Sequence, residues 1–224
     1  MAKRFNLGAV HYAHRGLWAL DGPAENSLTA FEAAARAGFG IEFDVRPDRD
    51  GIPIIFHDKR LDRMTEETGS VAARSAAQLG AITLKGSADQ IPSLEELLDI
   101  WPKDLPLLCE LKIDGETDAA AFARSVGTRL LEYDGQVAGM SFSEAAFAAL
   151  PKTLMRGQLI AASTMVGTQA IENLVERSQL MEADYLACHV SDVDLLSGLR
   201  APDTPLVTWT VPDREAHDHI IGDV

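Results

Sequence analysis

The chain has 224 residues, of which 46% are hydrophobic and 24% are charged, a composition typical of a packed globular protein. Its formal net charge of −14 argues against non-specific binding to nucleic acid, because such binding depends on Lys and Arg side chains that neutralise phosphates. Residues 1–60 do not share this acidity, since they hold eight Lys or Arg and eight Asp or Glu. A site built by this first quarter could therefore take an anionic substrate.

The beginning of the chain and its cysteines bear on where the protein works. No segment approaches the roughly 20 apolar residues that span a bilayer, and the apolar part of MAKRFNLGAVHYAHRG is too short for a signal peptide. We therefore expect a cytoplasmic protein without stable membrane insertion. Cys109 and Cys188 lie far apart in apolar segments, which predicts buried free thiols rather than a disulfide.

Apolar runs of strand length alternate with helical patterns along the chain. Strands are expected at residues 10–14, 41–45, 106–112, 136–141, 154–162, 184–190 and 205–211, with a short extra piece at 52–56 behind the second. Helices are expected at residues 27–37, from the capping box Ser93–Glu96 to Trp101, and at 117–131, 143–150, 168–179, 192–200 and 213–221. This alternation predicts a parallel sheet with crossover helices.

The length and the regular alternation favour an α/β fold of the (β/α)8 TIM-barrel type as a single domain, residues 1–224. The polar, turn-rich residues 58–90 are expected to form an insertion after the second strand. A complete barrel needs one more strand after the last helix. Since the chain ends at Val224, we expect this last strand to be missing.

Charged side chains stand where the predicted strands end. Glu42 and Asp44 share one face of their strand, because residues two apart point the same way, while their neighbours Ile41, Phe43 and Val45 fill the opposite face. The pair Glu110 and Lys112 ends the third strand in the same manner, and His14-Arg15 and His57 end two other strands. In barrels the active site forms at the carboxyl ends of the strands, so these groups should meet at one rim.

The chemistry of this set indicates a metal site beside a phosphate site. Three carboxylates in one cavity repel unless a cation neutralises them, and oxygen ligands without a thiolate select Mg²⁺ or Ca²⁺. The guanidinium of Arg15 and the ammonium of Lys112 suit a phosphoryl group. His14 and His57 could supply a base and an acid near neutral pH, so the predicted chemistry is phosphodiester cleavage.

A set of motifs in this order resembles the glycerophosphodiester phosphodiesterase family. The segments are HRG at 14–16, PENSLTAFEAA at 23–33, IEFDV at 41–45, DGIPIIFHD at 50–58, TG at 68–69, IPSLEELL at 91–98, ELK at 110–112 and VTWTV at 207–211. The resemblance implies a TIM-type barrel, one divalent metal ion, and a hydrolase of lipid and glycerol metabolism that converts glycerophosphodiesters into glycerol 3-phosphate and an alcohol.

The resemblance also implies a role for individual residues. It puts the metal ligands at Glu42, Asp44 and Glu110, the catalytic pair at His14 and His57, and the phosphate contacts at Arg15 and Lys112. It puts Trp209 on the pocket wall. Pro212 follows the VTWTV motif, at a position where the family commonly has a small polar residue. Glu25 and Asn26 either order the first loop and position Arg15 or start the helix, with Asn26 or Ser27 as its N-cap.

Other polar residues have a plainer interpretation. Asp58 by itself is interpreted as a solvated residue or a helix cap, and Arg46 with Asp48–Asp50 as a solvated turn.

Two other functions are compatible with the same residues. One is a phosphodiesterase of the related phospholipase C and sphingomyelinase D type, in which a substrate hydroxyl attacks phosphorus and forms a cyclic phosphate. The other is a phosphate-ester binding protein without turnover. Small water-soluble diesters such as glycerophosphocholine and glycerophosphoethanolamine are the favoured substrates. The choice between Mg²⁺ and Ca²⁺, the assignment of acid and base, and the oligomeric state, for which a homodimer is one alternative, stay open.

Overall fold

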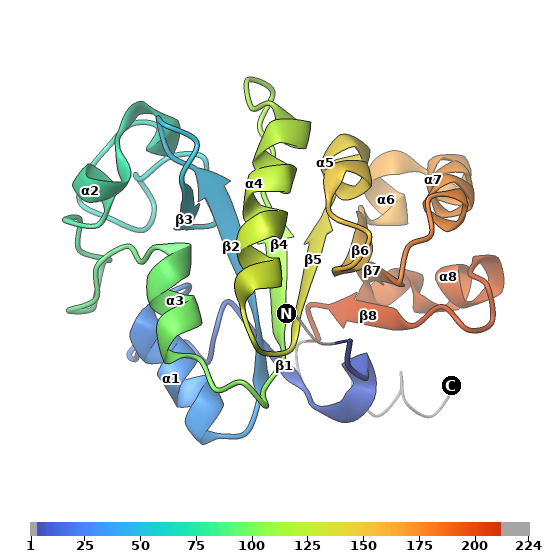
Figure 1. Ribbon diagram of the computed structural model, residues 1–224, viewed down its shortest axis with the longest axis horizontal. Coiled ribbons are helices and arrows are strands. Elements are labelled where there is room, and N and C mark those ends of the chain that lie inside the picture. The colour runs from blue at the N-terminus through green and yellow to red at the C-terminus, as the bar shows by residue number, and fades with distance from the viewer. Residues whose placement is uncertain (1–3, 212–224) are drawn as a thin grey trace. The chain divides into compact units, whose positions relative to one another are not determined.

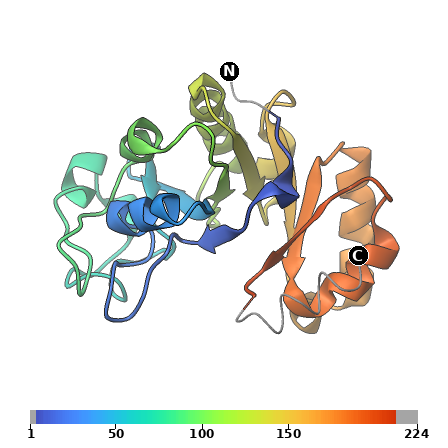
Figure 2. The same ribbon diagram turned by 90° about the horizontal axis from the view of Figure 1, so that it is seen from below.

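A computed structural model describes residues 4–211 of the protein. The chain forms two compact units, Met1–Met155 and Arg156–Val224, whose described residues run from blue to yellow and from orange to red in Figures 1 and 2. The single domain over residues 1–224 stays a prediction.

The first unit alternates parallel strands with helices. Its strands are β1 (Tyr12–His14), β2 (Gly40–Pro47), β4 (Leu107–Leu111) and β5 (Val137–Ser141). Its longer helices are α1 (Leu28–Arg36), α3 (Leu94–Ile100), α4 (Ala119–Glu132) and α5 (Glu144–Ala149). β2 lies between β1 and β4, and the register pairs His14 with Glu42 and Asp44 with Glu110. Residues from three strand ends therefore become neighbours.

Alternating side chains divide β2 and β4 into an apolar face and a polar one. Phe43 of β2 and Cys109 of β4 pack with Phe31 of α1, Leu97 of α3 and Val126 of α4 in one core. Figure 1 shows α4 lying in front of β4 on this side. The intervening residues of both strands point the other way, so the helices cover the apolar face and leave the polar face for chemistry.

A shorter segment follows β2 and carries little regular structure. β3 (Pro53–Ile55) pairs antiparallel with the end of β2, and between it and α3 lie only η2 (Val71–Ala73) and α2 (Ala76–Leu79). Leu61, Leu79 and Leu84 form a second core there with residues around β3. The segment predicted as an insertion is thus packed around apolar side chains of its own.

The second unit repeats the same pattern on a smaller scale. Its elements are β6 (Met155–Ile160), α6 (Ser163–Val166), α7 (Thr168–Leu180), β7 (Tyr185–His189), η3 (Val190–Asp192), α8 (Val193–Leu199) and β8 (Leu206–Trp209). The three strands are parallel, with β7 between β6 and β8. Ile171 of α7 and Leu196 of α8 pack against Leu186 and Cys188 of β7.

Most of the predicted elements are confirmed within a few residues. The α/β fold of TIM-barrel type is confirmed, with β3 as the extra piece after β2. Cys109 and Cys188 are buried free thiols, as predicted. The short elements η1 (Leu7–Ala9), η2, α2, α6 and η3 have no counterpart in the prediction, because three or four residues are too few to show a helical period. The helix expected at 213–221, Pro212 and the end of the chain lie outside the described residues.

The interpretation of Arg46 and Asp48 as part of a solvated turn is wrong. Both are buried, and only Arg49 and Asp50 are exposed as expected. The carboxylate of Asp48 accepts backbone N–H groups from Asp50 at 2.7 Å, Ile52 at 2.8 Å and Ala76 at 2.6 Å. A buried carboxylate that accepts three backbone N–H groups stabilises a tight turn from inside the fold. The polar residues around Asp48 give no sign of this burial in the sequence.

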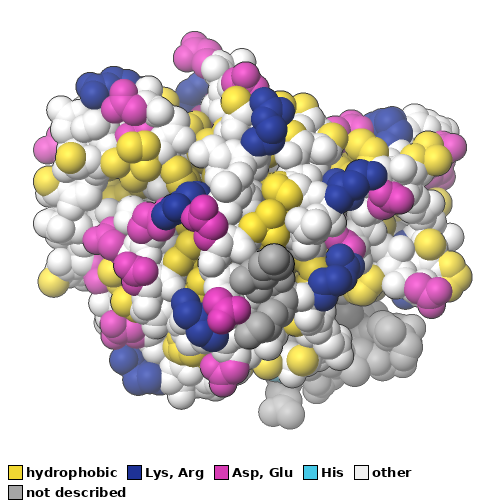
Figure 3. All heavy atoms as spheres, viewed as in Figure 1, with side chains coloured by type: hydrophobic (Ala, Val, Ile, Leu, Met, Phe, Trp, Pro, Cys, Tyr) yellow, Lys and Arg dark blue, Asp and Glu magenta, His cyan; other side chains and the backbone are white. Residues whose placement is uncertain are grey.

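Charges of both signs alternate on the outer surface. Figure 3 shows acidic and basic side chains side by side on the face that carries α3 and α4. Arg129 of α4, for example, contacts Glu95 of α3 at 2.7 Å and Glu132 at 2.6 Å. In the described part of the chain no helix has both the length and the apolar character needed to cross a membrane.

A pair of glycine substitutions tests the packing of the second unit. A Cβ atom at Gly157 would lie 2.2 Å from two ring atoms of the fully buried Tyr185, whereas nothing lies within 4 Å of one at Gly198 in α8. We expect Gly157→Ala to lower the free energy of unfolding by about 1–3 kcal/mol through overpacking. Gly198→Ala should raise it by up to about 1 kcal/mol, since alanine favours a helix. Thermal and urea unfolding measure both, and equal stabilities would contradict the packing described.

Candidate active site

Three buried carboxylates form the centre of the site. Glu42 and Asp44 extend from β2 and Glu110 from β4, and each offers an oxygen that lies within 4.8 Å of the other two. Their exposed fractions are 7%, 1% and 7%. The structure therefore brings together the three acids that the sequence places at neighbouring strand ends, and this triad could hold a metal ion.

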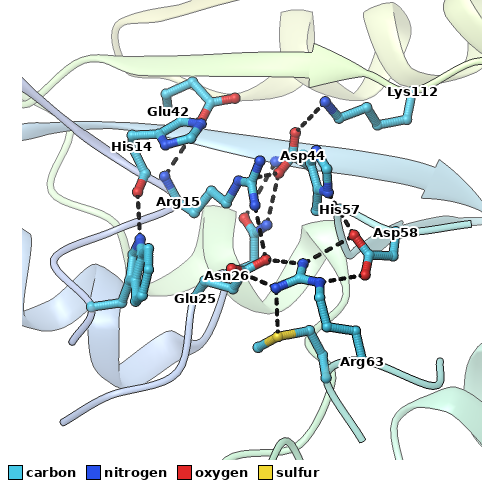
Figure 4. Close-up of polar contacts among 12 residues, drawn as sticks. His14, Arg15, Glu25, Asn26, Glu42, Asp44, His57, Asp58, Arg63 and Lys112 are labelled. Carbon is cyan, nitrogen blue, oxygen red and sulfur yellow. Dashed lines mark hydrogen bonds and ion pairs between the residues drawn. The ribbon is translucent and has the colours of Figure 1, made fainter. Parts of the chain in front are cut away.

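Two cations contact the triad. Lys112 Nζ lies 2.6 Å from Glu110 Oε1 and 3.1 Å from Asp44 Oδ1. Arg15 Nε lies 3.4 Å from Asp44 Oδ2, which also accepts a hydrogen bond from Asn26 Nδ2 at 2.8 Å. Figure 4 shows Arg15 and Lys112 approaching Asp44 from different sides. Asp44 thus receives most of the compensating charge.

One buried carboxylate oxygen of the triad is left without a donor. Among residues 4–211, no donor reaches Glu42 Oε1, while Asp44 Oδ1 and Glu110 Oε1 share a single cation, the ammonium of Lys112. Buried acceptors normally have a partner, because a buried group left unsatisfied destabilises the fold. An oxygen without a donor, next to two acids that share one ammonium, fits a site for a hard divalent cation.

The carboxylates differ in acidity. Burial raises the pKa of Glu42 well above its usual range, and the charges of Asp44 and Glu110 add to this effect. Burial and the charge of Asp44 raise the pKa of Glu110 to about 7, although Lys112 opposes them. Burial would also raise the pKa of Asp44, but Lys112, His57 and Arg15 outweigh it and lower the value. Without a metal, the negative charge of the triad is therefore concentrated on Asp44.

His14 ends β1 beside the triad. Its Nε2 lies 3.8 Å from Glu42 Oε2, and its backbone oxygen accepts a hydrogen bond from the Trp18 indole at 3.1 Å. Burial, followed by the charge of Arg15, lowers the pKa of His14 to about 4. The imidazole is consequently neutral at physiological pH and can accept a proton.

An unusual backbone turn directs Arg15 toward the triad. Arg15 and Asn26 have positive φ angles of 60° and 56°, and they are joined by a hydrogen bond from Asn26 N to Arg15 O at 2.8 Å. Gly16 follows with φ 83°, and a Cβ there would lie 2.9 Å from Ala30 Cβ. Non-glycine residues rarely adopt such angles, and functional sites often contain them. The motif HRG therefore has a steric reason for its glycine.

The first loop contributes more than a helix start. Ser27 is the N-cap of α1, since its Oγ accepts the Ala30 N–H at 3.1 Å. The side chain of Asn26 binds Asp44, and Glu25 Oε1 contacts Arg15 Nη1 at 3.0 Å. The helix thus begins with Ser27, one of the two predicted N-caps, while Asn26 and Glu25 contact residues of the site.

His57 follows β3 and is held by its neighbour. His57 Nδ1 lies 2.7 Å from Asp58 Oδ1, and Asp58 also accepts hydrogen bonds from Arg63 Nε at 2.6 Å and Nη2 at 2.9 Å. Burial lowers the pKa of His57, although Asp44 and Asp58 oppose it. For Asp58, hydrogen bonds from Arg63 and His57 outweigh the effect of burial and lower the pKa to about 2. The interpretation of Asp58 as a solvated or capping residue is wrong, because its partners fix its orientation.

Sequence reasoning missed Arg63. It belongs to the segment predicted as an insertion, where no periodicity marks any residue as inward. Its contacts are with Asp58 and with Glu25, which is 38 positions earlier in the chain. The only local signal was an arginine shortly after His57 and Asp58. Its presence in the sequence does not show where its side chain points.

Arg46 contacts the site and also lines a neighbouring cavity. Its Nε donates to the backbone oxygen of His57 at 2.7 Å, and its Nη1 contacts Asp114 Oδ2 at 2.6 Å. Both side chains line a cavity of about 490 Å³ between the start of α4 and η2, which contains none of the three carboxylates.

Trp209 lies in the second unit. Its ring packs edge-on against that of His189, with 5.3 Å between the ring centroids. The position of Trp209 on the pocket wall stays a prediction.

Comparisons with known proteins agree with the motifs. The sequence profile of the glycerophosphoryl diester phosphodiesterase family matches residues 14–221. "Probable glycerophosphodiester phosphodiesterase 2" of Mycobacterium tuberculosis is 40% identical over 96 residues, which cover 42% of this chain and 36% of that protein. Glycerophosphodiester phosphodiesterase 1 of Homo sapiens is 41% identical over 68 residues, or 30% of this chain and 20% of that protein. The chain thus matches well under two thirds of the length of either relative.

Solved structures share the fold over almost the whole chain. A glycerophosphodiester phosphodiesterase from Thermotoga maritima has a TM-score of 0.80 at 24% identity, covering 98% of this chain and 93% of that one. A phosphodiesterase from Oleispira antarctica, in complex with the product sn-glycerol-3-phosphate, has a TM-score of 0.79 at 24% identity and covers 95% and 89%.

The buried charge of Glu42 predicts a gain in stability when it is removed. A carboxyl group whose pKa is raised by folding destabilises the folded state at pH values above its ordinary pKa of about 4.3. Glu42→Gln keeps an oxygen for the Arg15 N–H, so in EDTA at pH 8 it should raise the melting temperature by about 2–4 °C for each kcal/mol regained. The gain should be smaller at pH 5, because taking up a proton on folding costs less free energy when the pH is closer to the ordinary pKa.

Glu116→Gln is the matched control, because Glu116 is exposed on the loop after β4. Its melting temperature should follow that of the parent at both pH values. A lower melting temperature of Glu42→Gln in EDTA at pH 8 would show that the carboxylate is stabilised by its surroundings, contrary to the argument above.

Proposed function

Because this chain belongs to the glycerophosphoryl diester phosphodiesterase family, we propose that it is a metal-dependent hydrolase that converts glycerophosphodiesters into glycerol 3-phosphate and an alcohol. The observation that carries the proposal is the buried triad of Glu42, Asp44 and Glu110, whose ligand oxygens lie within 4.8 Å of one another and whose charge is only partly offset by Arg15 and Lys112. An acidic cluster of this kind is unfavourable by itself, so its presence supports a function that needs a cation.

The triad would hold one Mg²⁺ or Ca²⁺ ion. When bound, such an ion polarises a phosphate oxygen and neutralises the charge that develops on it. Arg15 would bind a phosphate oxygen through its planar guanidinium, and Lys112 would add a point charge beside it. Positive charge around an otherwise acidic centre suits a substrate that carries a phosphodiester anion.

The two imidazoles would move the protons of the reaction. One takes a proton from the attacking water, whose oxygen forms the new bond to phosphorus. The other gives a proton to the alcohol oxygen as the old P–O bond breaks. His57 is bound to the carboxylate of Asp58, whereas His14 faces Glu42 at a longer distance, so the two occupy different electrostatic surroundings.

The substrate class rests on the family and on one neighbour. The relatives above are named for glycerophosphodiesters, and the Oleispira antarctica phosphodiesterase was solved with sn-glycerol-3-phosphate. Both support a glycerol phosphate group on one side of the scissile bond. Glycerophosphocholine and glycerophosphoethanolamine are therefore the first substrates to assay.

Metal removal is the first test. EDTA should abolish hydrolysis of glycerophosphocholine, and Mg²⁺ or Ca²⁺ should restore it. Glu110→Gln should weaken binding of the restoring ion in calorimetry, while Glu116→Gln on the exposed loop should bind it as the parent does. Because Glu42 and Glu110 must lose protons to bind, the affinity should fall as the pH drops below about 7, by roughly tenfold per pH unit for each proton released. Full activity in EDTA without bound metal would refute the metal requirement.

Histidine substitutions test the proton transfers. His14→Ala and His57→Ala should each lower kcat by about 10²–10⁴-fold on glycerophosphocholine, while His11→Ala, three residues before His14, should not. A glycerophosphate diester of p-nitrophenol needs no acid, since its leaving group is stable as an anion. The variant that lacks the acid should therefore recover most of its rate on that substrate, which identifies the acid. If both variants keep the parent rate, the two-histidine mechanism is wrong.

The turnover of glycerophosphocholine by the parent protein also distinguishes direct attack by water from formation of a cyclic phosphate. With phosphorus NMR in oxygen-18 water, direct attack by water puts label into glycerol 3-phosphate from the first turnover. A cyclic phosphate that appears before any labelled product would instead indicate the phospholipase C type of reaction.

A further inference from the structure

Arg63 joins two carboxylates on opposite sides of its guanidinium. On one side Nε and Nη2 contact the oxygens of Asp58 at 2.6 and 2.9 Å. On the other side Nη2 and Nη1 contact the oxygens of Glu25 at 2.6 and 3.1 Å. Figure 4 shows the guanidinium between these two acids. Such a double fork requires the planar geometry of arginine, since a lysine ammonium is a single point.

Each of the two acids contacts one of the groups proposed for the reaction. Asp58 Oδ1 lies 2.7 Å from His57 Nδ1, and Glu25 Oε1 lies 3.0 Å from Arg15 Nη1. Arg63 therefore stands at the middle of a continuous path from the His57 imidazole to the Arg15 guanidinium. The path joins two segments that are separate in sequence: the loop after β1, which holds Arg15 and Glu25, and the segment after β3, which holds His57, Asp58 and Arg63.

The contact with Asp58 decides which ring nitrogen of His57 carries the proton. Asp58 is held as a carboxylate by Arg63, so it can only accept from His57, and the proton must lie on Nδ1. Nε2 is then left for proton transfer. The Asp58 side chain is 22% exposed, so without Arg63 it could turn toward water and release the ring.

The contact with Glu25 keeps Arg15 in place. The Glu25 side chain is only 6% exposed, and its oxygens are divided between Arg15 and Arg63. Removal of Arg63 would leave a buried carboxylate with a single cation, which would draw Arg15 toward Glu25 and away from Asp44.

We propose that Arg63 is a positioning residue that sets the tautomer of His57 through Asp58 and the direction of Arg15 through Glu25. The inference rests on the proposed hydrolase function. It assigns part of the active-site geometry to residues 59–93, between Asp58 and α3, which contribute none of the proposed catalytic or metal-binding side chains.

The kinetics of single variants separate the effect of Arg63 on His57, through Asp58, from its effect on Arg15, through Glu25. Arg63→Met should lower kcat by about 10–100-fold, since small displacements of a catalytic group are costly, and should also raise KM. Asp58→Asn should lower kcat with little change in KM, and Glu25→Gln should do the reverse. Arg63→Lys should lie between the parent and Arg63→Met. Arg60→Met is the matched control, because Arg60 is in the same segment and pairs only with Asp62 in the described contacts; it should keep the kcat and KM of the parent.

The tautomer gives a readout that does not depend on turnover. Nitrogen-15 NMR of the imidazoles, with His57 assigned from the spectrum of His57→Gln, should show a single Nδ1–H tautomer in the parent in EDTA at pH 8. Arg63→Met should show a mixture of tautomers, and Arg60→Met should not. Melting temperatures identify any variant that has unfolded, in which case Arg63→Lys replaces Arg63→Met.

The outcomes distinguish this inference from the proposed function. Loss of kcat together with a mixed tautomer in Arg63→Met supports it. Parent-like kinetics, or a lower kcat while His57 keeps its single tautomer, overturns it. If the parent hydrolyses none of the diesters, the proposed function fails, and the NMR spectra still decide whether Arg63 controls His57.

Discussion

The repulsion among Glu42, Asp44 and Glu110 is the constraint around which the first unit is organised. Two adjacent parallel strands present these acids to the same side, at a depth where water cannot screen them. The fold offsets this with Arg15 and Lys112, and it does so incompletely, since Glu42 Oε1 has no donor among the described residues and the other two acids share Lys112. The site therefore carries an electrostatic cost that a bound cation would relieve.

The same two strands show how a stable core and an unstable site can coexist. On one face, Phe43, Cys109 and their neighbours pack against α1, α3 and α4 with almost no exposed surface. On the other face, the acids replace apolar side chains only near the carboxyl ends of the strands. Because successive residues of a strand point to opposite sides, the packed core and the acidic site use different positions of the same strands. Substitutions on one face need not disturb the other.

Ion pairs around the triad act as a second layer that orients the first. His57, Asp58, Arg63, Glu25 and Arg15 form an unbroken series of contacts between 2.6 and 3.0 Å. The segment that contributes Arg63 has its own apolar core around Leu61, Leu79 and Leu84. A packed core allows a turn-rich segment to hold one guanidinium in a defined place, which a flexible loop could not do.

The strands, the longer helices, the fold class and the proximity of the triad to His14, His57, Arg15 and Lys112 could be predicted from the amino-acid sequence. These features follow from local rules, because periods of 2 and 3.6 and the polar ends of strands are visible in short windows. The contacts of Arg63, Asp58 and the buried Asp48 became visible only in the folded chain. Asp48 accepts backbone N–H groups, and Arg63 contacts Glu25, which is far away in the sequence. Asp58 contacts nearby residues, but nothing in the local sequence shows that their side chains turn toward it. None of these hydrogen bonds leaves a periodic trace in the chain. A charged residue in a turn looks solvated until the fold brings its partner to it.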